Sequence, residues 1–176
     1  RRAWGEASAG APPARVVDAG PDRVGVRPVR RRIGDLLGVA ADAHGNRLRL
    51  FAAGARTSST FSAVVDLLPI APPAGTLPAG GWLASSVALR VVSSVPNFVT
   101  EQIAPAEVTI HYLPSQISNL DENTLTVFRW SLGSYSATGI SVVVANASSN
   151  SITFSSTQPG TFIIAGQPGT GDPRSP

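Results

Sequence analysis

The chain has 176 residues, a length typical of one domain, and a formal net charge of +3. It contains no Cys and only two His. These counts exclude disulfide scaffolds, Cys-ligated zinc sites, thiol nucleophiles and histidine-rich metal sites. No run approaches about 18 consecutive apolar residues, so the sequence predicts no membrane span.

Charge and hydroxyl residues are distributed unevenly along the chain. Residues 1–56 hold 11 of the 14 Arg and 5 of the 11 acidic residues, whereas the remainder is net acidic. Of the 32 Ser and Thr residues, only Ser8 precedes Thr57. This change in composition predicts a boundary between residues 43 and 57.

The front of the chain, residues 1–45, is rich in Arg, Ala, Gly and Pro and is predicted to be disordered. The favoured interpretation of this segment is a disordered or artefactual tail. The second interpretation is a signal-peptide remnant with a cleavage site at Ala41-Asp42-Ala43. A third interpretation is an arm for nucleic acid or an anionic membrane surface. Stacking aromatics are not interleaved with the Arg residues, so no nucleic-acid partner is expected.

Within this front, the apolar residues Ile33, Leu36, Leu37 and Ala40 recur at helical spacing. They predict a short apolar helical stripe, which the neighbouring glycines weaken.

From residue 47 onward the pattern changes to short β-like runs between turn residues. Eight strands are expected, followed by a disordered tail over 167–176; the runs are 47–51, 61–68, 87–92, 108–112, 125–130, 140–145, 151–155 and 161–165. Residues 146–150 are predicted to form a hairpin loop, and 118–121 one helical turn. Residues 46–166 therefore predict an all-β, immunoglobulin-like antiparallel sandwich.

A Pro-rich stretch, residues 69–75, interrupts the β-like pattern. Three interpretations apply to it: a linker between two domains, a polyproline II ligand, or a loop crossing within one sandwich. The loop is favoured, because only about 20 residues of the sandwich precede the stretch.

The segment 108–130 reads VTIHYLPSQISNLDENTLTVFRW, with a strand, a turn, an LDExTL motif and a strand ending in RW. It resembles a segment near the C-terminus of bacterial secreted and surface-anchored proteins, in ZU5-like and GAIN-like β-sandwich modules. The resemblance covers about residues 76–166, including the weaker TLPAGG entry at 76–81. It implies a folding module within a larger exported protein.

Two parts of the sequence depart from that family. After the RW dipeptide the chain reads SLGSY, and Gln158-Pro159-Gly160 replaces the usual start of the final strand. The His-Leu-Ser/Thr tripeptide on which GAIN-type self-cleavage relies is missing, so no autoproteolysis is expected.

The LDExTL motif also has a structural interpretation. Leu120 and Leu125 are expected to be buried on either side of a corner, where Asp121 and Asn123 bond nearby amides. The predicted packing residues are Ile110, Tyr112, Leu120, Leu125, Val127, Phe128, Trp130, Ile152, Phe154 and Phe162.

Candidate chemical groups are few. His111 and Glu107 share one strand face and suggest metal binding or acid–base work, with Asp121 as an unproven partner and His44 at the tail junction. A solvent-facing histidine is favoured. The adjacent Asp121 and Glu122 diverge, and no nucleophile elbow, calcium loop or phosphate loop occurs. No catalytic, metal or cofactor site is therefore predicted.

Four aromatic residues, Trp82, Tyr112, Trp130 and Tyr135, suggest a platform on which a sugar ring stacks. The alternative is that most of them fill the core or cover the sheet ends. We therefore expect a monomeric, non-enzymatic structural or interaction module of a secreted or cell-surface bacterial protein. Its expected partners are other domains of the same polypeptide or cell-surface components. A carbohydrate-binding module with a polysaccharide partner is the alternative.

Overall fold

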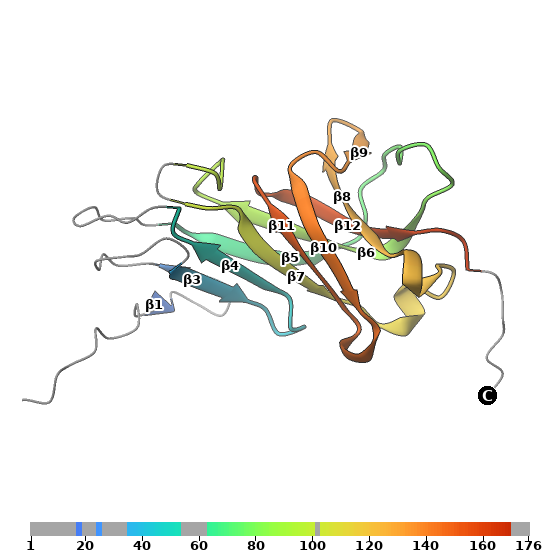
Figure 1. The fold of residues 1–176 in the computed structure, drawn as a ribbon, viewed down its shortest axis with the longest axis horizontal. Coiled ribbons are helices and arrows are strands. Elements are labelled where there is room, and N and C mark those ends of the chain that lie inside the picture. The colour runs from blue at the N-terminus through green and yellow to red at the C-terminus, as the bar shows by residue number, and fades with distance from the viewer. Residues whose placement is uncertain (1–16, 19–23, 26–34, 54–62, 101–102, 170–176) are drawn as a thin grey trace, which may run out of the picture.

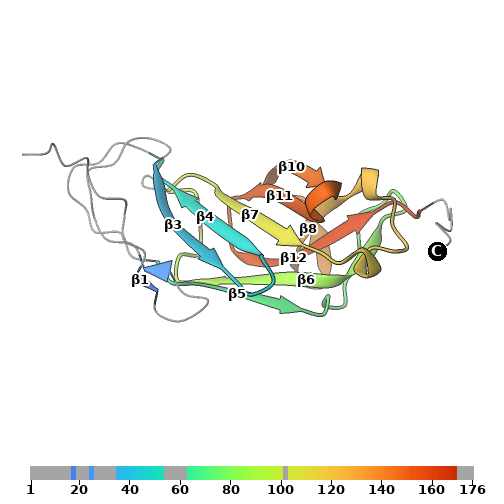
Figure 2. The same ribbon diagram turned by 90° about the horizontal axis from the view of Figure 1, so that it is seen from below.

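The computed structural model describes residues 17–18, 24–25, 35–53, 63–100 and 103–169. Two five-stranded antiparallel sheets pack face to face (Figure 1), which confirms the predicted all-β sandwich. Viewed along the layers, β3, β4 and β7 lie over β5 and β6 (Figure 2). No helix in the described ranges is long and apolar enough to cross a membrane.

The first sheet, called sheet 1, has the order β10-β11-β7-β4-β3. Its strands are β3 (Leu36–Ala41), β4 (Arg47–Phe51), β7 (Ala106–His111), β10 (Ile140–Asn146) and β11 (Ser151–Ser156). Sheet 2 has the order β5-β6-β12-β8-β9. Its strands are β5 (Val65–Ile70), β6 (Leu83–Ser93), β8 (Thr126–Ser131), β9 (Ser134–Ser136) and β12 (Gly160–Gly166).

Smaller elements complete the described chain. A two-stranded ribbon pairs β1 (Val17–Asp18) with β2 (Val24–Gly25). Three 3-10 turns, η1 (Pro114–Gln116), η2 (Glu122–Thr124) and η3 (Ala147–Ser149), lie in loops. The helical turn expected at 118–121 is wrong, because η1 and η2 lie on either side of that segment.

Strict alternation creates the main core between the sheets. In β7, Ala106, Val108 and Ile110 are buried, whereas the residues between them are half-exposed. Across the sandwich, Phe154 of sheet 1 and Phe162 of sheet 2 lie 5.0 Å apart between ring centroids. All ten predicted packing residues are buried except Trp130, which is half-buried.

The helical stripe expected over residues 33–40 is wrong where the structure describes it, because Leu36–Ala41 form β3. A bulge between Leu36 and Gly38 shifts the register against β4, so that Leu37 and Ala40 are both buried. The bulge thus gives a strand the three-residue spacing that resembles a helix. The sandwich includes β3 and so extends before the expected boundary at residue 46. Residues 1–16, 19–23 and 26–34 lie outside the described residues.

The chain after β12 continues to make contacts. The amide of Asp121 donates to the carbonyl oxygen of Gln167 at 2.9 Å, and the amide of Gly169 donates to that of Asn119 at 3.0 Å. The first residues of the expected tail over 167–176 are therefore bonded to the sandwich, and 170–176 lie outside the described residues.

Candidate functional site

The Pro-rich stretch lies within one sandwich, as predicted, since β5 and β6 on either side of it pair with each other. Its first two residues, Pro69 and Ile70, belong to β5, so the loop starts only after them. We call residues 71–82 the strap. β5 and β9 are opposite edges of sheet 2, yet the strap leaves β5 and forms a parallel bridge to β9 through Thr76 and Ser134. Figure 1 shows this green segment beside β9. The strap therefore crosses the outer face of sheet 2 before it returns to β6.

Beneath the strap lies a second apolar cluster. Ala88, Ile163 and Phe128 are register neighbours on β6, β12 and β8, and they are buried on the face that points away from the main core. Leu77 and Trp82 of the strap pack against this cluster. Trp82 meets Phe128 edge to face, with ring centroids 5.6 Å apart.

Two aromatic side chains of sheet 2 bind the strap backbone. The Tyr135 hydroxyl donates to the carbonyl oxygen of Pro73 at 2.6 Å, and Trp130 Nε1 donates to that of Ala74 at 3.0 Å. The Thr76 amide donates to Gly133 O at 3.0 Å, and the Tyr135 amide donates to Thr76 O at 2.8 Å. Burial raises the pKa of Tyr135 above its ordinary value.

The structure brings together three of the four aromatic residues predicted as a sugar platform. Trp130 and Tyr135 bind the strap, and Trp82 is its last residue; both tryptophans stay half-exposed. Tyr112 lies apart, in the main core, where its hydroxyl donates to Glu122 Oε1 at 2.8 Å. Burial, followed by the hydrogen bond to Glu122 and its charge, raises the pKa of Tyr112 above 10.0. The four residues therefore do not form one surface.

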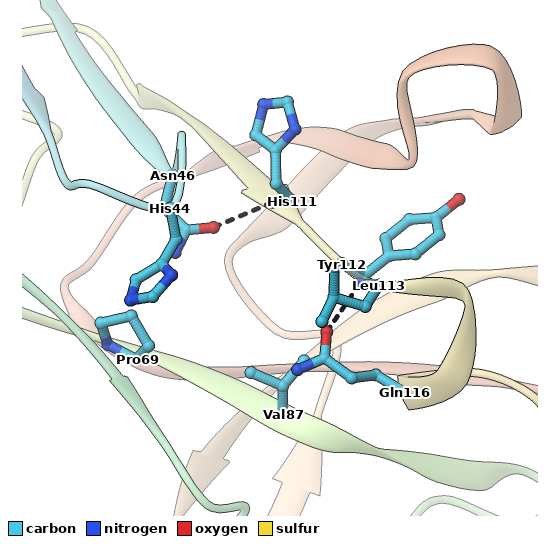
Figure 3. A pocket seen from close by; sticks show the side chains of 8 residues that line it. All are labelled: His44, Asn46, Pro69, Val87, His111, Tyr112, Leu113 and Gln116. Carbon is cyan, nitrogen blue, oxygen red and sulfur yellow. Dashed lines mark hydrogen bonds between the residues drawn. The ribbon is translucent and has the colours of Figure 1, made fainter.

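A second site is a pocket of about 270 Å³ where the β3–β4 turn and the end of β7 meet β5 and β6 (Figure 3). Its lining residues are His44, Asn46, Pro69, Val87, His111, Tyr112, Leu113 and Gln116. Both histidines of the chain contribute, but their rings point in different directions, that of His44 toward Pro69. The sequence placed His44 at the tail junction and did not predict that it would lie near His111.

Asn46 holds this region together and was missed by the sequence analysis. It is 3% exposed, its Nδ2 donates to Asp42 Oδ2 at 2.7 Å, and its Oδ1 accepts the His111 amide at 2.8 Å. Asp42 Oδ1 also accepts the amides of His44 and Asn46, both at 2.9 Å. An Asp and an Asn on either side of a glycine turn are the sequence signal that could have identified this connection.

The pair of His111 and Glu107 lies on the outer face of sheet 1, as predicted. Glu107 Oε1 accepts from Arg49 Nη1 at 2.9 Å, and the two side chains form a partly exposed ion pair. Within the described ranges, no three His, Asp or Glu side chains gather closely enough to hold a metal ion. Asp121, the other candidate partner, lies at the corner before η2.

That corner has the predicted structure. Leu120 and Leu125 are buried, and Asp121 Oδ1 accepts the amide of Asn123 at 3.0 Å. The Asn123 side chain bonds the Asp121 carboxylate rather than a backbone amide. The Thr124 hydroxyl accepts the Gln167 amide at 2.8 Å, which connects the corner to the end of β12.

Comparison of the chain with protein-family models, curated proteins and solved structures finds no match.

Proposed function

We propose that this chain is a non-enzymatic structural or interaction module of a bacterial secreted or cell-surface protein. One observation supports the proposal most strongly: both tyrosines and the Arg49–Glu107 pair use their polar groups to hold segments of the fold together. Glu107 pairs with Arg49, Tyr112 donates to Glu122, and Tyr135 donates to the strap. The same proposal places the module beside other domains of its own polypeptide or beside cell-surface components, outside the cell.

A carbohydrate-binding module is the second candidate. Trp82 and Trp130 favour this second candidate. Both pack against the second apolar cluster, both are half-exposed, and both have apolar rings on which a sugar could stack. In that case polysaccharide would be the partner. Trp130 and Tyr135, however, already use their polar atoms to bind the strap.

Replacing Trp82 and Tyr135 singly with Ala distinguishes the two candidates. A structural role predicts a lower melting temperature for both variants, because each removes an aromatic ring from the second apolar cluster. A sugar platform predicts lost retention in polysaccharide affinity gels with unchanged melting. Leu132→Ala is the matched control, because Leu132 is 97% exposed in the turn before Tyr135. Unchanged melting in both aromatic variants contradicts the structural role.

A further inference from the structure

The outer face of sheet 2 contacts the strap in two ways. It packs against the strap side chains Leu77 and Trp82, and it forms hydrogen bonds to the strap backbone. The Tyr135 hydroxyl and the Trp130 indole donate to consecutive carbonyl oxygens, those of Pro73 and Ala74. Because the chain bends at Ala74, both of these consecutive carbonyl oxygens lie within reach of donors on the sheet.

Proline suits these positions for a physical reason. Pro72 and Pro73 have no N–H group, so their backbone leaves no amide donor unsatisfied when it lies against aromatic rings. Consecutive prolines also restrict φ, and the chain loses less conformational entropy when it is bound. Aromatic grooves that bind proline-rich segments use this combination of rings and polar donors.

The next position favours glycine. A Cβ atom on Gly75 would lie 3.0 Å from Tyr135 Cε2 and 3.1 Å from both Trp130 Cδ1 and Gly133 O. The two rings that bind the preceding carbonyls therefore also select against a side chain after Ala74.

We propose that Trp130, Tyr135 and the β8–β9 turn form a recognition groove for a Pro-Pro-Ala-Gly segment that bends at its alanine. The strap fills this groove in cis, and a partner peptide with the same chemistry fills it when the strap is displaced. This inference rests on the proposed interaction role and names the partner class: an uncharged proline-rich segment with small residues.

The chain itself supplies a matched control peptide. The tetrapeptide Ala-Pro-Pro-Ala occurs at 71–74 before Gly75 and again at 11–14 before Arg15. A peptide of residues 69–78 carries the glycine that fits, and one of residues 9–18 carries an arginine in its place. The groove is expected to bind the first and to reject the second.

Isothermal titration calorimetry tests the inference on the full chain with residues 71–81 replaced by a Gly/Ser linker of equal length. The 69–78 peptide is expected to bind this variant saturably, and the unmodified chain is expected not to bind it, because its tethered strap competes at a high effective concentration. Adding Trp130→Phe and Tyr135→Phe removes both donors and is expected to weaken binding roughly tenfold.

Circular dichroism first establishes that the strap-replaced chain is folded. If the strap-replaced chain does not fold, the Gly75→Arg variant of the otherwise intact chain is used in its place. The arginine side chain is expected to displace the strap, because it would collide with Tyr135, Trp130 and Gly133 O. A folded, strap-displaced chain that does not bind the peptide overturns the inference, as does equal binding of the 9–18 peptide. Either result leaves the melting test of the structural role unaffected, so the two proposals fail separately.

Discussion

At the scale of single residues, polar and aromatic side chains connect segments that are distant in sequence. Asn46 joins the β3–β4 turn to the end of β7, Tyr112 joins β7 to η2, and Tyr135 joins β9 to the strap. Each is buried, so each hydrogen bond compensates for a polar atom removed from water. Such residues affect stability more than their small number suggests.

Asn46→Ala is expected to lower the free energy of unfolding by about 1–3 kcal/mol, because it removes the acceptor of the His111 amide in a buried position. Denaturant unfolding followed by circular dichroism measures the loss. His44→Ala in the same turn is the control, and a change within about 0.5 kcal/mol is expected for its exposed side chain. Equal effects of the two substitutions would refute the assigned role of Asn46.

The two tyrosines of the chain both have a raised pKa in the folded state. Their contribution to stability is therefore complete below the unfolded value of 10.0 and declines as the pH rises above it. Tyrosinate absorbance is expected to appear together with loss of the β circular-dichroism signal. Tyrosinate formed near pH 10.0 in a chain that keeps its fold would contradict the buried positions.

At the scale of elements, bulges interrupt both edge strands of sheet 1. The bulge in β3 lies near Leu36, and the one in β10 lies between Ser141 and Val144. Val142 has a φ of 52°, a left-handed conformation unfavourable for a β-branched side chain, and is 72% exposed. A bulged, bent edge pairs less readily with another chain, which suits an edge strand that carries no charge.

Val142→Gly is expected to raise the free energy of unfolding by up to about 1 kcal/mol, since glycine adopts positive φ without strain and little apolar burial is lost. Thermal unfolding measures the gain. Val144→Gly is the control within the same strand; it relieves no strain and is expected to destabilise. A loss of stability in both variants would indicate that Val142 is not strained.

The sequence predicts elements well where one periodicity applies throughout. Each of the eight expected runs overlaps a strand, and the alternation coincides with one buried face most clearly in β7. β3 and β9 were not predicted for different reasons. A bulge imitates helical spacing in β3, and β9 has only three residues. The bond from Asn46 to Asp42 lies within one turn and has a sequence signal, but its bond to the His111 amide joins another strand, and the spacing along one chain does not reveal that contact.

At the scale of the whole molecule, the two outer faces differ. Sheet 1 presents polar groups such as the Arg49–Glu107 ion pair and the Thr109–Thr153 hydroxyl pair, 2.9 Å apart. Sheet 2 is covered by the strap. Of the four residues suggested as a sugar platform, Trp82, Trp130 and Tyr135 lie in one cluster, and sugar binding there stays a prediction. Composition alone could not show that a loop from the opposite edge lies at this position.

The position of β3 makes a prediction about the smallest stable chain. Residues 35–169 are expected to fold with a melting temperature close to that of the full chain. A chain that starts at Asn46 loses Leu37 and Ala40 from the core and leaves Leu48 and Leu50 poorly covered. It is expected to melt at a markedly lower temperature or to aggregate. Equal melting of both shortened chains would place the start of the sandwich after β3.

The binding of the strap by sheet 2 is tested most directly by hydrogen exchange, measured by NMR on the full chain. The amides of Thr76 and Tyr135 and the indole N–H of Trp130 donate to Gly133, Thr76 and Ala74. All three are expected to exchange far more slowly than in an unstructured peptide, and Tyr135→Phe is expected to accelerate the Trp130 and Thr76 exchange. Exchange of all three at the unstructured rate would contradict the arrangement of strap and sheet.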